Sequence, residues 1–462
     1  MANVDLATKW LELVEKDQVA VSTTIKVRDK DDKEQKVGVR YGVRVHPNSS
    51  PPEQVSYMEF VQGTDEISSQ HPTIATINTT LVQAAAANAD APESVQFRFH
   101  GNYVAQLQLV RTLRPPPSPG FGTSLDTKSS STPPEYNSET DSFVTGPLRL
   151  QMRPLIAKLN LSSLTTPWDI FHNVSPADVR GHFLLIPTLD DPDKNWREQA
   201  LRASDCSDLV YLTASVEPVG SLFVCFNSVG AGASQNHIHC HLWPSPPIPL
   251  LEQRLPTTHN DHDESTTGNS HDHDHCHEHT HSHNEDTEIR GWNCYPVSLV
   301  QSIYDFTDIT NDDGETLVEV SYLDYPCFCI QLSSVSHTKQ DNQQSLSVLG
   351  KAIWEVSSCI GDAPHNVCLV NRPAADNAGL NDVDVYMFIR SRERSPTVVP
   401  ESKLGASEMM GVFHCQSRQQ LEELTQGGYD ESPMEQALQE VSHDQTDGLW
   451  DTIKAKLSSM EC

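Results

Sequence analysis

Apolar residues in this chain recur in short runs, and long stretches of helical periodicity are rare. Alternating apolar and polar positions are typical of strands that bury one face, whereas short continuous apolar runs indicate strands buried on both faces. These runs predict strands at 95–110 (one strand or a pair), 181–187, 221–230, 237–244, 327–334, 365–372 and 384–391. Helical spacing is clearest at 195–216 and 351–361. Many strands with few helices between them favour an α+β fold with a mostly antiparallel sheet flanked by helices.

Two polar segments divide this pattern. Residues 115–146 are rich in Pro, Ser and Thr, and residues 256–289 hold nine of the 21 histidines. Neither segment has enough apolar side chains to form a core, so we expect a linker or mobile loop and a disordered insertion, respectively. We expect an N-terminal helix and the first strands of the core at 1–114. The two halves of a histidine-triad-like catalytic core are expected at 147–255 and 290–415, and a C-terminal helical segment at 416–462.

The charge balance limits the classes of partner. The chain has 32 basic and 63 acidic residues, giving a net charge of −31. Nucleic acid and anionic membranes attract clustered Lys and Arg, so we expect neither as a partner. No run of 18 apolar residues and no secretory signal are visible, and the 11 cysteines follow no disulfide spacing. These features favour the cytosol, with the nucleus left open.

The strongest chemical signal is the segment FNSVGAGASQNHIHCHLWP at 226–244. In an extended strand, His237, His239 and His241 would share one face. The preceding loop, with Gly232, Ser234 and Asn236, can offer backbone and side-chain donors to a phosphate. The imidazoles would therefore serve either as metal ligands or in covalent nucleotidyl transfer, in which one of them attacks a phosphorus atom. The alternative is a core strand with incidental histidines.

This segment resembles the active-site strand of the histidine-triad superfamily, and is close to that of galactose-1-phosphate uridylyltransferases. The matching residues are Gly232, Ser234, His237, His239, Cys240 and Trp243. A second segment, FHNVSPADVRGHFLLIP at 171–187, resembles the "NVSP…GH-x-LL-x-P" of the GDP-L-galactose and GDP-D-glucose phosphorylases. Weaker similarities at 103–117, 323–334, 365–372, 386–396 and 404–413 follow in the same order. The resemblance implies a duplicated histidine-triad architecture.

The resemblance also implies roles for single residues. His239 matches the nucleophile, and His237 matches the histidine that supports it. Ser234 and Asn227 match positions that contact phosphate oxygens. Asn173 and His182 match a region that lines the nucleotide pocket in the wider superfamily.

The third triad position departs from the pattern of transferases and plant phosphorylases, which usually carry Gln there. His241 is typical of the hydrolase branch, and a titratable side chain can protonate a leaving group where Gln cannot. The implied reaction is ping-pong transfer of GMP from a GDP-hexose to inorganic phosphate, with no cofactor. The alternatives are a nucleotide hydrolase, a diadenosine-polyphosphate phosphorylase, and a metal-binding or sensor protein. A homodimer, as in the related transferases, is left open.

The histidine-rich insertion has a chemistry of its own. Alternating histidines with acidic neighbours bind zinc weakly and in many registers. The candidate ligands are His271, His273, His275, His277, His279, His281 and His283. The alternative is a tolerated surface insertion without function.

Overall fold

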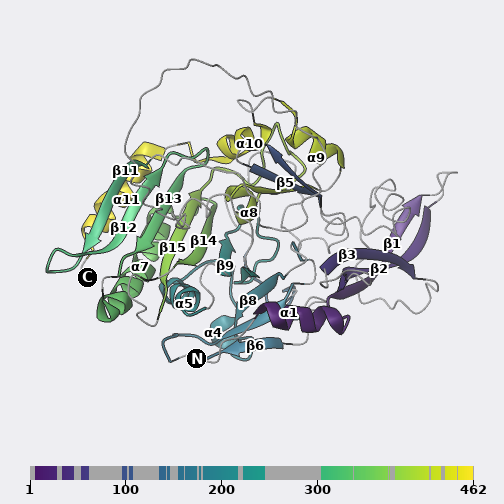
Figure 1. Ribbon diagram of the computed structural model, residues 1–462, viewed down its shortest axis with the longest axis horizontal. Coiled ribbons are helices and arrows are strands. Elements are labelled where there is room, and N and C mark those ends of the chain that lie inside the picture. Colours follow the sequence, from purple (N-terminus) through teal and green to yellow (C-terminus); the bar gives the residue numbers. More distant parts are fainter. Residues whose placement is uncertain are drawn as a thin grey trace, which may run out of the picture.

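The protein is described from a computed structural model (Figure 1). The description covers residues 6–28, 34–45, 54–61, 96–100, 103–107, 135–141, 143–145, 155–160, 162–173, 176–177, 181–216, 222–244, 303–336, 338–372, 374, 380–415, 418–427, 432–444 and 446–460. The histidine-rich insertion and its seven candidate zinc ligands lie outside these residues.

A ten-stranded sheet forms the centre of the molecule, and all of its neighbouring strands are antiparallel. From edge to edge it contains β11 (Ile303–Thr310), β12 (Thr316–Leu323), β13 (Cys329–Ser334), β15 (Asp382–Ile389), β14 (His365–Arg372), β9 (Leu222–Asn227), β10 (Cys240–Pro244), β8 (Phe183–Pro187), β7 (Trp168–His172) and β6 (Leu155–Leu159). The expected α+β class with a mostly antiparallel sheet is therefore confirmed.

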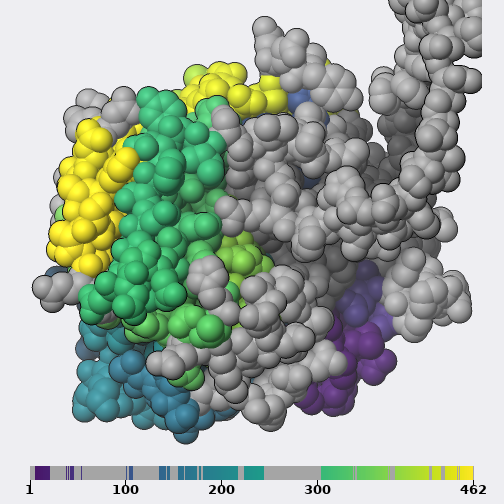
Figure 2. Space-filling view, turned by 60° about the vertical axis from the view of Figure 1, so that its left-hand side comes forward, coloured from purple at the N-terminus to yellow at the C-terminus, as the bar shows by residue number. Residues whose placement is uncertain are grey.

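The sheet separates two layers because both of its faces are buried. On β9, Val224 and Phe226 pack in one core cluster, while Phe223 and Cys225 pack in the other. The first cluster includes residues of α1 (Leu6–Glu15), α5 (Ala203–Ala214), α7 (Lys339–Ile360) and α11 (Thr446–Ser458). The second includes residues of α8 (Ala406–Met409), α9 (Arg418–Leu424) and α10 (Pro433–Val441). Figure 2 shows α11, in yellow, lying beside the green strands.

The order of the strands contains an internal repeat. β6, β7, β8, α5, β9 and β10 form one half of the sheet, and β11, β12, β13, α7, β14 and β15 form the other half in the same sequence. Each half has the spatial order first, second, third, fifth, fourth strand, counted from its edge. The halves meet where β9 pairs with β14, and α5 packs against α7 across the same seam. The short helix α4 (Pro192–Asn195) precedes α5.

Two small sheets lie outside this arrangement. One contains β1 (Ala20–Arg28), β2 (Glu34–Val45) and β3 (Gln54–Val61). The other contains β4 (Gln96–His100), β5 (Tyr103–Leu107) and β16 (Val412–Cys415), with β16 parallel to β5. The strands β1–β5 therefore lie outside the ten-stranded sheet, although Val43 of β2 and Tyr103, Ala105 and Leu107 of β5 belong to its two core clusters. α1 anchors the N-terminal part, because Trp10 is fully buried and its ring meets Phe183 edge-on.

Several boundaries differ from the sequence expectations. The strand signal at 95–110 is a hairpin of β4 and β5. The helix expected at 195–216 begins only at Ala203, because Arg197 and Gln199 bond to the triad segment and to Asp205 instead. α7 is longer than expected and begins at Lys339. None of the helices in the described ranges has the length and hydropathy of a membrane span.

Candidate active site

The three triad histidines follow a tight loop between β9 and β10. The loop turns through Gly230 and Gly232, whose φ angles of 79° and 100° belong to the left-handed region that favours glycine. A Cβ atom on Gly232 would lie 2.7 Å from the Gly405 Cα. We expected a strand over 237–244, but β10 begins at Cys240, so only His241 is a strand residue. His237 and His239 precede the strand, because the Ile238 N–H donates to the Arg197 carbonyl rather than to a neighbouring strand.

His239 is held as a neutral imidazole. Its Nδ1 lies 2.7 Å from the His237 carbonyl oxygen, which can only accept, so Nδ1 carries the proton. Burial lowers the pKa of His239 from 6.5 to about 4, so the ring is neutral at pH 7. Nε2 therefore carries the lone pair, and it forms no hydrogen bond with any residue in the described part of the chain. A neutral imidazole with this geometry can act as a nucleophile or a base.

His237 is paired with a carboxyl group. The side chain of Asp141 lies 2.5 Å from the His237 Nδ1, and both residues are buried. Asp141 also accepts from the Tyr136 hydroxyl at 2.8 Å and from the Phe143 N–H at 2.8 Å. Three donors thus fix this carboxyl group, which orients the His237 ring. The His237 Nε2 is buried and has no hydrogen-bond partner among the described residues.

Asp141 lies in the segment 115–146 that we expected to be a linker or mobile loop. Of this segment the structure describes 135–141 and 143–145, and these residues pack onto the histidines. The Phe143 ring contacts His239 at a centroid distance of 5.1 Å. The signal that could have revealed this contribution is a pair of aromatic residues, Tyr136 and Phe143, flanking an acid in an otherwise polar segment.

His241 is linked to His182, a residue expected near the nucleotide pocket. The Ala177 N–H donates to the His182 Nδ1 at 2.8 Å, so the neutral His182 carries its proton on Nε2. This Nε2 lies 2.9 Å from the His241 Nδ1, which then accepts. In its neutral form His241 therefore carries a proton on Nε2, whereas His239 carries a lone pair there. The Asn173 amide lies 3.3 Å from the His182 Nε2, and Trp243 stacks on the His182 ring at 4.3 Å.

The Gln199 side chain forms hydrogen bonds with both backbone groups of His239. Its side-chain amide donates to the His239 carbonyl at 3.0 Å and to the Asn227 carbonyl at 2.8 Å, while its oxygen accepts from the His239 N–H at 2.9 Å. The nearby Arg197 guanidinium forms a buried ion pair with Asp205 at 2.6 Å. Sequence reasoning assigned no role to Gln199, since a single glutamine within a helix signal has no motif around it.

Of the remaining candidate residues, Asn227 and Asn236 form hydrogen bonds with other described residues through their side-chain oxygens, whereas Ser234 does not. Asn227, expected to contact phosphate, uses its side-chain oxygen to accept from the Asn366 amide at 2.8 Å and from the Ala406 N–H at 2.9 Å. Its oxygen therefore ties the loop to the second half of the sheet. The Asn236 oxygen accepts from the Gln199 N–H at 3.1 Å. Ser234 is half-buried and its hydroxyl makes no hydrogen bond within the described residues, which leaves it open to a ligand.

A buried arginine extends this link between the halves. Arg390 is fully buried and donates to the Asn366 side-chain oxygen at 3.3 Å and to the Leu404 carbonyl at 2.6 Å. Asn366 in turn donates to the Ala231 carbonyl at 2.7 Å, inside the glycine loop. The second half of the sheet thus shapes the loop of the first half.

Nothing in the described residues marks the three imidazoles as a metal site. Their ring nitrogens bond to a carboxyl group, a backbone carbonyl and another imidazole, respectively. Within the described ranges, no group of three or more His, Cys, Asp or Glu side chains could hold a metal ion. The arrangement suits acid, base or nucleophilic chemistry.

Comparisons of this chain with protein-family models, with curated proteins and with solved structures find no match.

Proposed function

We propose that this protein is a nucleotidyltransferase of the GDP-hexose phosphorylase type. The observation that carries the proposal is the opposite protonation of two adjacent imidazoles. The His239 Nε2 offers a lone pair, and the neutral His241 carries a proton on the corresponding nitrogen. The two rings lie 5.1 Å apart, so a nucleophile and a hydrogen-bond donor for the leaving oxygen lie side by side. The motif similarity at 171–187 and 226–244 directs the choice of substrate class.

In the proposed first step, the His239 Nε2 attacks the α-phosphorus of a GDP-hexose. A P–N bond forms, the bond from the α-phosphorus to the bridging oxygen breaks, and hexose 1-phosphate leaves. The neutral His241 donates a hydrogen bond from its Nε2–H to the departing oxygen, which leaves as the anion, and the His182 Nε2–H bonded to the His241 Nδ1 orients this donor. The positive charge that develops on the His239 ring is stabilised by the bond from its Nδ1–H to the His237 carbonyl. Asp141 and the His237 carbonyl keep the His239 ring oriented, which lowers the cost of reaching the transition state.

In the second step, phosphate attacks the α-phosphorus of the guanylyl-histidine and releases GDP. The Ser234 hydroxyl and the backbone N–H groups of the glycine loop are the candidate donors to the phosphoryl oxygens. The new P–O bond forms as the P–N bond to His239 breaks, and the electron pair of that bond returns to the His239 Nε2, while His241 keeps its proton. The reaction therefore restores both imidazoles to their starting forms.

A hydrolase is the second candidate, because one observation favours it. His241 is hydrogen-bonded to His182, and a histidine at this position is typical of the hydrolase branch that the sequence resembles. If water instead of phosphate attacks the guanylyl-histidine, the product is GMP. The acceptor is the point on which the two candidates differ.

The test is a single assay of GDP-L-galactose and GDP-D-glucose with and without phosphate, using the wild-type chain and His239→Asn. We expect phosphate-dependent GDP and hexose 1-phosphate from the wild type, and a loss of at least about 1,000-fold in the variant. GMP formed without phosphate would select the hydrolase. Turnover by His239→Asn at the wild-type rate would reject both candidates.

A further inference from the structure

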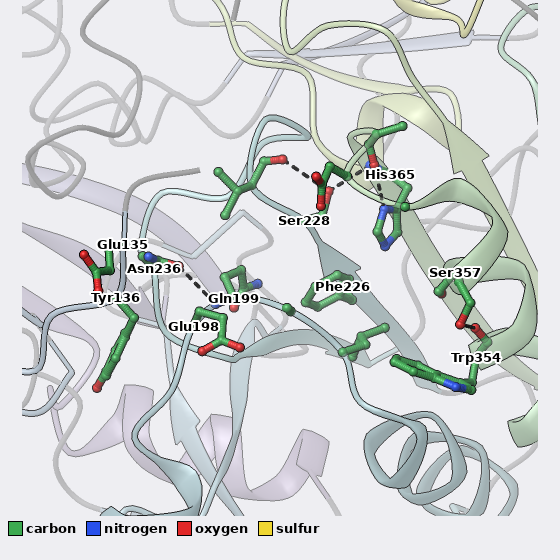
Figure 3. A pocket seen from close by; sticks show the side chains of 17 residues that line it. Glu135, Tyr136, Glu198, Gln199, Phe226, Ser228, Asn236, Trp354, Ser357 and His365 are labelled. Carbon is green, nitrogen blue, oxygen red and sulfur yellow. Dashed lines mark hydrogen bonds between the residues drawn. The ribbon is translucent and has the colours of Figure 1, made fainter. Parts of the chain in front are cut away.

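A cavity lies beside the loop between β9 and β10, against the face of the sheet opposite to His241. Its volume is about 790 Å³, and neither His237, His239 nor His241 lines it. Phe226, which lines the cavity, packs with the helix layer, whereas His241 pairs across the sheet with Cys225, which belongs to the other cluster. Figure 3 shows this cavity between the segment that carries Glu198 and Gln199 and the helix that carries Trp354 and Ser357.

The wall of this cavity is rich in hydrogen-bond acceptors. Glu135, Glu198 and Asp362 line it, and none of the three forms an ion pair with a described residue. His365 adds another acceptor. Its Nδ1–H donates to the Ala363 carbonyl at 2.9 Å, which leaves the lone pair on Nε2, and burial lowers its pKa. No Lys or Arg is among the described residues of the wall. An anion would be repelled, and a ligand with several N–H donors and positive charge is favoured.

The carboxyl groups are distributed rather than gathered. They come from three separate segments: the stretch before Asp141, the connection between α4 and α5, and the turn after α7. They form no cluster that could chelate a metal within the described residues. Between them lie apolar and aromatic surfaces, including Trp354 and Phe226. An aromatic face attracts an ammonium group, and the apolar wall suits methylene carbons.

We propose that this cavity binds a linear aliphatic polyamine, with ammonium groups at the separated carboxyl groups and methylene segments against Trp354 and Phe226. Gln199 is shared between the cavity and the triad, because the same side chain holds the main chain of His239. Tyr136 is shared as well, since its hydroxyl bonds to Asp141. A bound polyamine therefore contacts two residues that position the triad.

The experiment is calorimetric titration with spermidine at about 150 mM salt, which screens weak surface attraction. The test variant is Glu198→Gln/Asp362→Asn. The matched control is Glu319→Gln/Asp312→Asn, which removes the same charge from exposed positions on and beside β12, outside the cavity. We expect one saturable site in the wild type and in the control. Both carboxyl groups are exposed, so losing each charge weakens binding by up to about fivefold, and the test variant should bind about 10- to 25-fold more weakly.

Other outcomes would overturn the proposal. Equal weakening in both double variants, or many weak sites that scale with salt, would show only attraction to the acidic surface. Mg²⁺ binding with the same dependence on Glu198 and Asp362 would indicate a metal site instead. Trp354→Leu supplies a second measure that leaves the charge unchanged, and binding as tight as wild type in this variant would reject the aromatic contact. None of these readouts depends on catalytic activity.

Discussion

At the residue scale, the candidate site is a chain of hydrogen bonds that assigns each imidazole a different state. Asp141 orients His237, the His237 carbonyl fixes the proton of His239, and His182 fixes the proton of His241. Alternation alone predicts three histidines on one strand face, and the resemblance implies different roles for them without saying what sets their protons. What distinguishes them is their partners, and Asp141 and Ala177 lie far away in sequence.

Asp141→Asn tests the first link of this chain. The amide keeps the shape of the side chain but holds His237 less firmly, and loss of such an orienting partner typically costs 10- to 100-fold in activity. Because the change acts through orientation, we expect kcat to fall by about that factor with little change in KM for the proposed GDP-hexose substrate. The exposed Glu139→Gln in the same segment should leave kcat unchanged. An equal fall in both variants would show that the whole segment, not the carboxyl group, matters.

The buried imidazoles also predict how stability depends on pH. Burial lowers the pKa values of His172 and His239 from 6.5 to about 4. Between these values the unfolded chain binds protons that the folded chain does not, so the free energy of unfolding falls as the pH drops from 6.5 towards 4. The slope is about 1.4 kcal/mol per pH unit for each group.

Urea unfolding at pH 7, 6 and 5 measures this slope. His172→Asn removes one of the two groups and should make the decline shallower by about 1 kcal/mol per pH unit below pH 6. A variant curve that runs parallel to the wild type would contradict the assignment of His172.

At the element scale, local signals predict which segments form strands and helices better than where they begin. The strand signal at 237–244 fails at its start because the segment around Ile238 bonds to Arg197, and no local pattern encodes that partner. Alternation likewise does not separate β1–β5 from the strands of the large sheet, since it predicts a strand but not its neighbour. The close approach of α5 and α7 is also invisible in the sequence, although it depends on one glycine.

Gly350 permits this approach. A Cβ atom there would lie 2.8 Å from the Ser207 Cα, a contact with backbone that cannot move aside cheaply. We expect Gly350→Ala to destabilise the protein by about 1–3 kcal/mol because α5 and α7 must separate. Gly448→Ala in α11 is the matched control, since its Cβ would meet nothing within 4 Å, and it should stabilise by about 0.5–1 kcal/mol. Urea midpoints that shift in the same direction would contradict this account.

At the scale of the whole molecule, the ten-stranded sheet is two copies of one strand order joined at β9 and β14. The sequence shows no short repeat, because each copy spans about 90 residues and the two copies carry different side chains. The first copy supplies the triad, and the second supplies Asn366 and Arg390, which hold the glycine loop. The site therefore requires both copies, even though its recognisable motif lies in one.

This division predicts that the chain can be separated between the copies and reassembled. The fragments 1–255 and 290–462 each contain one copy, and omitting 256–289 removes no described residue. Co-expressed, they should co-purify, because the β9–β14 pairing and the α5–α7 contact join them and bury apolar surface that either fragment alone would expose. Gly350→Leu in the second fragment should abolish co-purification by pushing α5 and α7 apart, whereas Gly448→Leu should not. Monomeric fragments that remain folded and soluble when expressed separately would show that the copies are independent domains. Insoluble fragments that become a soluble pair only together would show that neither copy completes a core alone.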